Sequence, residues 1–168
     1  SEIESCFIEL INTHGYNALI GVVYKPPSVS CDTFSEHMND ILEKVSHENK
    51  KCFIMGDFNI NLLQFDTNNE VRNFIDILSS QSFFPTINKP TRITENTATL
   101  IDNILTNDLH NHKAGVLVTD VSDHLPVFLL IDSSSWKEKG EERYVCNKRR
   151  DFKSDNIEHF VNDLNAAD

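Results

Sequence analysis

Apolar residues gather first in two short runs near the amino end of the chain. Residues 6–11 and 17–24 are rich in β-branched and other apolar side chains, and a polar loop that ends in Gly15 separates them. This arrangement predicts a hairpin of two antiparallel strands. The second strand must end at Pro26, because proline cannot donate a hydrogen bond to a neighbouring strand.

Two longer segments carry apolar residues at helical spacing. In the first, Thr33 and Glu36 form a capping-box pattern, which predicts the start of a helix. In the second, either Thr67 or Asn68 is a suitable cap. The apolar stripes are Phe34, Met38, Ile41, Leu42 and Val45 in the first helix, and Val71, Phe74, Ile75 and Leu78 in the second.

Further apolar runs predict strands at residues 51–55, 100–105, 116–119 and 127–131. The polar stretch 88–99 predicts an ordered connection. Strands and helices therefore mix without a strict alternation. This order predicts an α/β sandwich whose sheets are mixed or antiparallel.

The composition changes after the last predicted strand. Residues 133–143 are polar and charged, and Asp155 with Glu158 predicts the start of another helix, which carries its own apolar stripe. We expect one domain over residues 1–132 and a linker over residues 133–168 that leads toward a following domain.

The charge balance of the chain is acidic. Its 15 Lys and Arg residues stand against 26 Asp and Glu residues, for a net charge of −11. Proteins that hold phosphates by charge alone are basic, so a nucleic-acid substrate would require a divalent cation bound by carboxylates. An acidic surface that serves solubility is the alternative.

The cysteines and the hydropathy bear on location. No two of the four cysteines form a Cys-x-x-Cys pair, which favours neither zinc nor disulfides and fits a reducing, intracellular compartment. No apolar run approaches the roughly 20 residues that span a bilayer. We expect an intracellular protein without a membrane partner.

Polar side chains with catalytic potential follow two of the predicted strands. Asp123 and His124 come soon after one of them, and histidine is the side chain best suited to act as a base near neutral pH. The alternative is a turn aspartate beside a surface histidine. Asp57 and Asn59 follow Gly56 at the end of the other strand, where they could bind a metal and a phosphate or form a simple Asx turn.

Asp102 lies inside an apolar run, where an unpaired carboxylate costs several kcal/mol. We expect His124 to be its partner, because a carboxylate bound to one ring nitrogen fixes the tautomer of the other. A strand that points Asp102 to solvent is the alternative. Tyr24 ends a strand, so its hydroxyl could reach the site, or the residue could serve packing alone.

Several segments, taken in chain order, resemble the later motifs of the endonuclease/exonuclease/phosphatase superfamily. They are Tyr-Lys-Pro-Pro at 24–27, Gly-Asp-Phe-Asn at 56–59, Leu-Ile-Asp-Asn-Ile-Leu at 100–105 and Ser-Asp-His-Leu-Pro-Val at 122–127. With Lys-Pro-Thr-Arg at 89–92, they are most similar to the endonuclease domains of non-LTR retrotransposon polyproteins. The resemblance covers about residues 5–131 and implies part of a four-layered α/β sandwich, with two packed sheets flanked by helices.

The resemblance also implies catalytic roles. His124 would act at the scissile phosphate and Asp102 would orient it. Asp57 would position or activate the attacking water, Asn59 would help to hold the phosphate, and Tyr24 would contact it. The implied reaction is metal-dependent hydrolysis of DNA that nicks a target site for retrotransposition.

The implied cofactor is Mg²⁺ or Mn²⁺, with no small organic cofactor. Asp57 and Asp123 would contribute to the metal environment. The family also places an asparagine and a metal-binding glutamate on earlier strands, and neither has a counterpart before Tyr24. We therefore expect an amino-terminally truncated domain that is marginally stable when isolated.

The implied partners are DNA, in the nucleus, and a downstream reverse transcriptase domain of the same polyprotein. Two alternatives stay open. The chain could be a catalytically inactive fragment of such a domain, or a phosphoesterase of the same superfamily that acts on lipid or inositol phosphates.

Overall fold

The computed structural model describes residues 3–11 and 17–131. Its helices are α1 (Cys31–His47), α2 (Asn69–Ser80) and the 3-10 turn η1 (Leu62–Gln64). Its strands are β1 (Glu4–Ile11), β2 (Asn17–Tyr24), β3 (Lys51–Asp57), β4 (Phe84–Pro85), β5 (Arg92–Ile93), β6 (Ala98–Thr99), β7 (Asp102–Thr106), β8 (His112–Val116) and β9 (Val127–Ile131). The linker and the helix predicted after residue 132 lie outside the described residues.

A five-stranded mixed sheet forms the centre of the molecule, in the order β1-β2-β3-β7-β4. β1 and β2 pair antiparallel, as the sequence predicts. β2 and β3 are parallel, and α1 provides the crossover that parallel neighbours need. β7 runs antiparallel to β3, so the end of β3 meets the start of β7 at one edge of the sheet.

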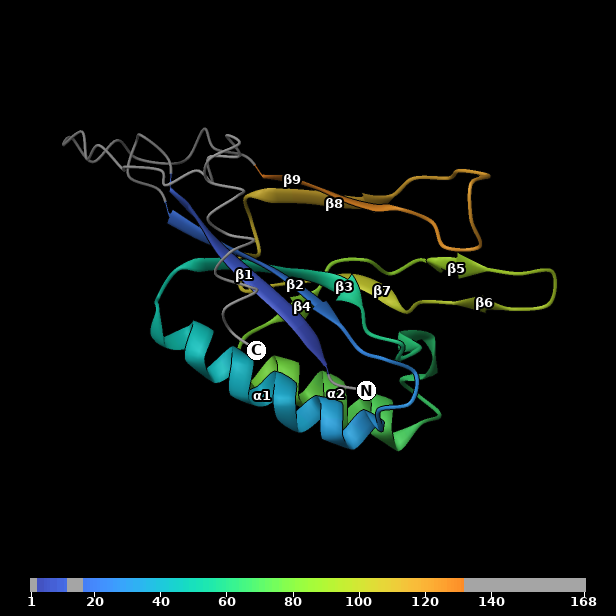
Figure 1. The fold of residues 1–168 in the computed structure, drawn as a ribbon, viewed down its shortest axis with the longest axis horizontal. Coiled ribbons are helices and arrows are strands. Elements are labelled where there is room, and N and C mark those ends of the chain that lie inside the picture. Colours follow the sequence, from blue (N-terminus) through green and yellow to red (C-terminus); the bar gives the residue numbers. More distant parts are fainter. Residues whose placement is uncertain (1–2, 12–16, 132–168) are drawn as a thin grey trace, which may run out of the picture.

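Both long helices lie side by side on one face of this sheet (Figure 1). Their predicted apolar stripes form the core, in which the rings of Phe34, Phe58 and Phe74 have centroids 5.8 to 6.2 Å apart. Burying each ring contributes about 1.5–3 kcal/mol. Phe58 follows Asp57 directly, so this packing also anchors the turn at the end of β3.

Two smaller sheets complete the described part of the chain. β8 and β9 form an antiparallel pair that lies across the main sheet from the helices, and β5 and β6 form a ribbon that projects from one end (Figure 1). The predicted α/β class with more than one sheet is confirmed. The described residues supply a helix layer, the main sheet and the β8–β9 pair.

Several predicted boundaries are wrong. α1 begins at Cys31, and its cap is Ser30, whose Oγ accepts from the Thr33 N–H at 3.1 Å. Thr33 therefore lies inside the helix, and no capping box with Glu36 starts it. Of the two caps predicted for α2, Thr67 and Asn68, the structure shows Asn68.

The strand predicted at 116–119 is also wrong. β8 occupies His112–Val116, and its pairing with β9 stops near Pro126, which has no N–H to continue the ladder. β7 begins at Asp102 instead of residue 100, because the Leu100 and Ile101 N–H groups bind the side chains of Asn61 and Thr91.

The connection at 88–99 is ordered, as predicted, and it contains the short strands β5 and β6. None of the described helices is long and apolar enough to cross a membrane.

Candidate active site at the β3–β7 edge

Asp57 is the last residue of β3, and two backbone hydrogen bonds fix the chain around it. The Lys25 N–H donates to the Asp57 carbonyl oxygen at 3.0 Å, which joins the end of β2 to the end of β3. The Phe58 N–H donates to the Ile101 carbonyl oxygen at 2.9 Å. In the antiparallel register, Asp57 lies opposite Asp102. The carboxylates of β3 and β7 are therefore neighbours because of strand pairing.

Asn59 forms the Asx turn that the sequence left open, and it also lies at the site. Its N–H donates to Asp57 Oδ1 at 2.9 Å, and its Nδ2 donates to the Lys25 carbonyl oxygen at 2.8 Å. Its backbone has φ 46°, in the left-handed region that asparagine tolerates better than most residues. The turn and the functional position are thus compatible, and Asn59 is held between the ends of β2 and β3.

Asp102 and His124 form the contact that the sequence predicts. His124 Nδ1 lies 3.1 Å from Asp102 Oδ2 and 3.2 Å from Oδ1. An ionised carboxylate only accepts, so the Nδ1–H donates and Nε2 points away from Asp102. The side chain of Asp102 is 17% exposed, which excludes a strand that simply points it to solvent.

Asp57, Asp102 and His124 lie together at this edge. Each offers one ligand atom, and the three atoms lie within 4.8 Å of one another. The two carboxylates are the hard oxygen donors that Mg²⁺ and Mn²⁺ prefer, whereas imidazole is a poorer donor for these ions. The donor set fits a divalent cation held mainly through the carboxylates.

Burial raises the pKa of Asp57, and the neighbouring Asp102 carboxylate acts in the same direction. The Asn59 N–H, His124 and Arg92 oppose this rise without cancelling it. A carboxylate in this environment accepts a proton more readily than an exposed one, and a nearby cation would favour its charged form.

Asp123 lies beside His124 but outside this group of three. Its Oδ2 accepts from Arg92 Nε at 2.8 Å, and this hydrogen bond lowers the pKa of the Asp123 carboxyl. Tyr24 ends β2 at the same edge of the sheet, directly before Lys25, and is 39% exposed. The roles expected of Asp123 and Tyr24 stay predictions.

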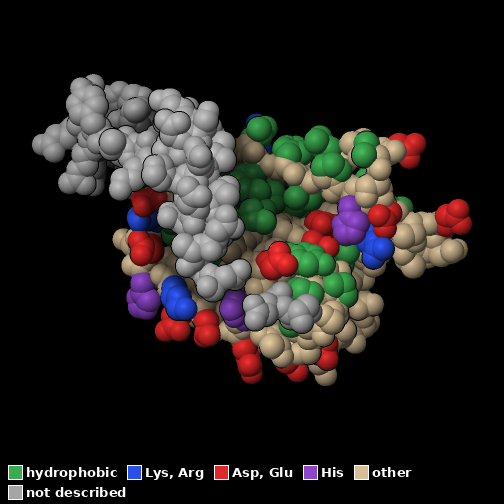
Figure 2. Space-filling model, viewed as in Figure 1, with side chains coloured by type: hydrophobic (Ala, Val, Ile, Leu, Met, Phe, Trp, Pro, Cys, Tyr) green, Lys and Arg blue, Asp and Glu red, His purple; other side chains and the backbone are tan. Residues whose placement is uncertain are grey.

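The sequence pattern did not single out Arg92 as a site residue. Arg92 is paired with His124 through an isolated backbone bridge and brings a positive charge beside the carboxylates. Acidic, basic and histidine side chains gather at the base of the projecting ribbon (Figure 2). An exposed arginine in a polar stretch has no hydrophobic pattern around it, so only its place beside Thr91 in a family-like run could have marked it.

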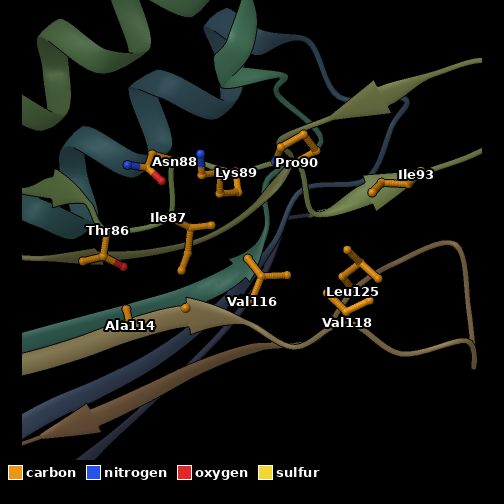
Figure 3. Close-up of a pocket in the computed structure, with 11 residues that line it drawn as sticks. Thr86, Ile87, Asn88, Lys89, Pro90, Ile93, Ala114, Val116, Val118 and Leu125 are labelled. Carbon is orange, nitrogen blue, oxygen red and sulfur yellow. The ribbon is translucent and has the colours of Figure 1, made fainter.

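A pocket of about 470 Å³ lies next to this edge. Its walls come from residues 86–90, from the end of β8 and from Leu125, which follows His124 (Figure 3). Ile87, Pro90 and Val116 make the lining mostly apolar, and Asn88 and Lys89 add polar groups. The site therefore borders a concave surface.

A family model described as "Endonuclease-reverse transcriptase" matches residues 18–128, which is more than half of the chain. Among curated protein sequences, none matches this chain.

Solved structures with a similar fold include an endonuclease domain. The endonuclease domain of TRAS1, a telomere-specific non-LTR retrotransposon, aligns with TM-score 0.62 and 15% identity over 76% of this chain and 63% of that one. The catalytic domain of APE2 from Xenopus laevis aligns with TM-score 0.55 and 17% identity over 76% and 54%.

An endonuclease/exonuclease/phosphatase family protein from Leptotrichia buccalis C-1013-b aligns with TM-score 0.53 and 19% identity, over 77% of this chain and 53% of that one. The chain thus spans less than two thirds of each of these structures. At these identities the likeness concerns the fold, and it confirms the predicted superfamily fold. The matched family model completes the assignment: this chain belongs to the endonuclease-reverse transcriptase family.

Proposed function

We propose that this chain is part of a divalent-metal-dependent endonuclease that hydrolyses DNA phosphodiester bonds. The hydrogen bond between Asp102 and His124, beside Asp57 at one sheet edge, is the observation that carries the proposal. Phosphodiester hydrolysis needs a group that takes a proton from water and groups that stabilise charge on the phosphate. This edge supplies both kinds.

Asp57 is the proposed acceptor of the proton from the attacking water. In the metal-free site, burial raises the pKa of Asp57, and a carboxylate with a higher pKa accepts a proton more readily than an exposed one. The water oxygen forms a bond to phosphorus, and the bond from phosphorus to the leaving sugar oxygen breaks. The leaving oxygen keeps the electron pair of that bond and takes up a proton from solvent. The Asn59 backbone N–H holds Asp57 Oδ1 in place during this transfer.

His124 is proposed to act at the scissile phosphate. Asp102 fixes Nδ1, so Nε2 faces the substrate, and an imidazolium donates from both nitrogens to stabilise developing negative charge. The Asn59 amide carries a second N–H that could donate to the phosphate, and Tyr24 is proposed to contact the phosphate from the end of β2.

The site fits a divalent cation, and Asp57 with its neighbour Asp102 would hold it. When bound, Mg²⁺ or Mn²⁺ supplies Lewis-acid stabilisation of phosphate charge, which an acidic chain of net charge −11 otherwise lacks. Asp123 is proposed to contribute its charge to the surroundings of the cation, although its carboxylate is bound by Arg92.

The biological setting belongs to the same proposal. The family description names a reverse transcriptase, and one similar structure comes from a non-LTR retrotransposon. These support a parent polyprotein whose endonuclease nicks chromosomal DNA in the nucleus for retrotransposition. A reverse transcriptase domain would follow this one, with residues 133–168 as the linker.

Nicking of supercoiled plasmid in the presence of Mg²⁺ tests the proposal. We expect the 168-residue chain to convert supercoiled to open circular DNA, and His124→Ala to lower the rate about 100-fold or more. His37→Ala, an exposed histidine on α1, is the matched control and should nick like the wild type. Chelation by EDTA should stop the reaction, and Mg²⁺ or Mn²⁺ should restore it.

Absence of nicking by the wild-type chain would favour the catalytically inactive fragment. Nicking that survives in His124→Ala would contradict the assigned site. Faster hydrolysis of a small phosphomonoester, or of a lipid or inositol phosphate, than of DNA would favour the phosphoesterase reading.

A further inference from the structure

Thr91 is a buried polar residue that touches both halves of the proposed site. It is 0% exposed and lies between the pocket-lining segment and β5. A polar side chain buried to this degree must have hydrogen-bond partners to be tolerated. The partners of Thr91 are the two chain segments that carry Asp102 and His124.

The hydroxyl of Thr91 holds the start of β7. Thr91 Oγ1 accepts from the Ile101 N–H at 3.2 Å and from the Asp102 N–H at 3.0 Å. The Ile101 N–H lies just before the regular ladder between β3 and β7, and the Asp102 N–H belongs to the first β7 residue of that ladder. One side-chain oxygen therefore sets where the backbone of Asp102 enters the strand.

The backbone of Thr91 holds the segment that carries the histidine. The Leu125 N–H donates to the Thr91 carbonyl oxygen at 2.6 Å. The next two residues continue this contact, since the Ile93 N–H donates to the Asp123 carbonyl oxygen at 2.8 Å and Arg92 binds the Asp123 side chain. His124 is thus enclosed by contacts on both sides that come from the same short stretch.

Thr91 also connects to the ribbon. Its N–H donates to the carbonyl oxygen of Thr99, the last residue of β6, at 2.9 Å. The hydroxyl, the carbonyl and the N–H of Thr91 therefore all bond to backbone atoms of other segments. Thr91 therefore occupies a fixed position relative to both β7 and the segment before β9.

We propose that Thr91 is a positioning residue that sets the distance between Asp102 and His124. Its hydroxyl fixes the carboxylate side and its carbonyl fixes the imidazole side, so a shift of Thr91 changes the hydrogen bond at His124 Nδ1. Displacements of about 1 Å in supporting residues are enough to lower catalysis about 100-fold. The proposal rests on the proposed function only for its effect on rate, because the Asp102–His124 bond can be observed directly.

The test compares three variants of the 168-residue chain. Thr91→Val keeps the shape and removes the acceptor, whereas Thr91→Ser keeps the hydroxyl. Thr106→Val is the matched control, because Thr106 is 1% exposed and its hydroxyl bonds the Cys52 carbonyl and the Asp108 N–H at the other end of β7. Each variant is examined by thermal unfolding, by nicking kinetics and by ¹H–¹⁵N spectra of the histidine side chains.

We expect Thr91→Val to shift the Nδ1–H signal of His124 and to lower kcat about tenfold or more with little change in KM, since ground-state binding of DNA is not altered. Thr91→Ser should restore both. Thr106→Val should lower the unfolding temperature to a similar extent and leave the His124 signal and kcat as in the wild type.

An unchanged His124 signal in Thr91→Val would overturn the positioning role, as would an equal change in Thr106→Val. If Thr91→Val does not fold, failure of the folded Thr91→Ser variant to keep the wild-type signal would overturn it. A wild-type chain that shows the signal and its loss in Thr91→Val, but does not nick DNA, would support the positioning role and count against the proposed function.

Discussion

Asp57 combines two requirements that oppose each other. Its place at the end of β3, against Phe58 and opposite Asp102, removes water from its carboxylate and raises its pKa. The same place brings it within ligand distance of Asp102 and His124. The chain thus gives up some folding free energy at this residue in return for an assembled site.

Asp57→Asn should remove the free-energy cost of burying a carboxylate at this position. A carboxyl whose pKa is raised on folding holds its proton more tightly in the folded chain, so the wild type loses stability as the pH rises between the unfolded and the folded pKa. The amide has no charge to desolvate, and its oxygen can still accept from the Asn59 N–H. We expect the variant to unfold at a higher temperature at neutral pH, with the gain gone below about pH 4.

Thermal unfolding from pH 3 to pH 8 in metal-free buffer measures this difference. Asp76→Asn, on the exposed side of α2, is the control and should show no such pH dependence of the difference. A gain for Asp57→Asn that stays constant across the range would contradict the assigned cause. Nicking should be lost in Asp57→Asn in spite of its stability.

The residues of the site differ in how well the sequence predicts them. Asp102 could be paired with His124 in advance, because a carboxylate in an apolar strand must find a partner. The partner of Asp123 could not be predicted in advance. Its ion pair with Arg92 is exposed and leaves no hydrophobic pattern, and each of the two charged side chains is also stable when it is solvated by water. Thr91 was hidden for a related reason, since its hydrogen bonds go to backbone atoms distant in sequence.

At the scale of elements, Gly56 allows β2 and β3 to meet closely beside the site. A Cβ on Gly56 would overlap the carbonyl oxygen of Val23, a backbone atom of β2. Backbone in a paired strand cannot move away as a side chain can. Because glycine has no side chain, the ends of β2 and β3 can approach closely at this position. This close approach also brings Lys25 near Asp57.

Gly56→Ala should separate these strand ends. Overpacking costs typically 1–3 kcal/mol, and we expect a loss of about 3 kcal/mol here because the obstacle is backbone. Gly21→Ala is the matched control in β2, where the added Cβ would meet the ring of Phe7, which can rotate, so about 1 kcal/mol is expected. Urea unfolding measures both losses, and an equal loss in the two variants would contradict this account.

Element type was easier to predict than element boundaries. β2, β9 and the two long helices follow from strong apolar periodicity. The boundaries depend on which of several possible acceptors each backbone N–H group binds. Ser30 caps the helix that Thr33 was expected to cap, and Thr91 holds the N–H group of Ile101, which was expected to lie within a strand that begins at residue 100.

At the scale of the whole molecule, apolar side chains are exposed on the strands away from the helices. Ile8 on β1 and Val22 on β2 are 59% and 55% exposed, and Leu130 on β9 is 60% exposed. Hydrophobic side chains lie along the β8–β9 sheet and in the hollow beneath it (Figure 2). Such surfaces favour association with other apolar surfaces.

We expect the isolated chain to bind a hydrophobic dye such as ANS and to aggregate on heating, as the sequence predicts for a marginally stable domain. Replacing Val118 and Val121 by serine should lower dye binding and slow aggregation, because these side chains are 90% and 91% exposed. The unfolding midpoint should change little. Thr97→Ser, in the turn between β5 and β6, is the control.

A sharp, cooperative unfolding transition from a soluble monomer that binds no dye would contradict the expectation of marginal stability. Dye binding that is equal in the wild type and the double serine variant would place the responsible surface elsewhere.

The three clustered side chains come from β3, from β7 and from the segment before β9, so they are distributed between residues 57 and 124. Their proximity is created by strand pairing over a long stretch of chain and is absent from any shorter piece. During synthesis, the cluster cannot be complete until His124 has emerged from the ribosome. The order of synthesis therefore delays assembly of the proposed site until nearly all of the described fold has left the ribosome.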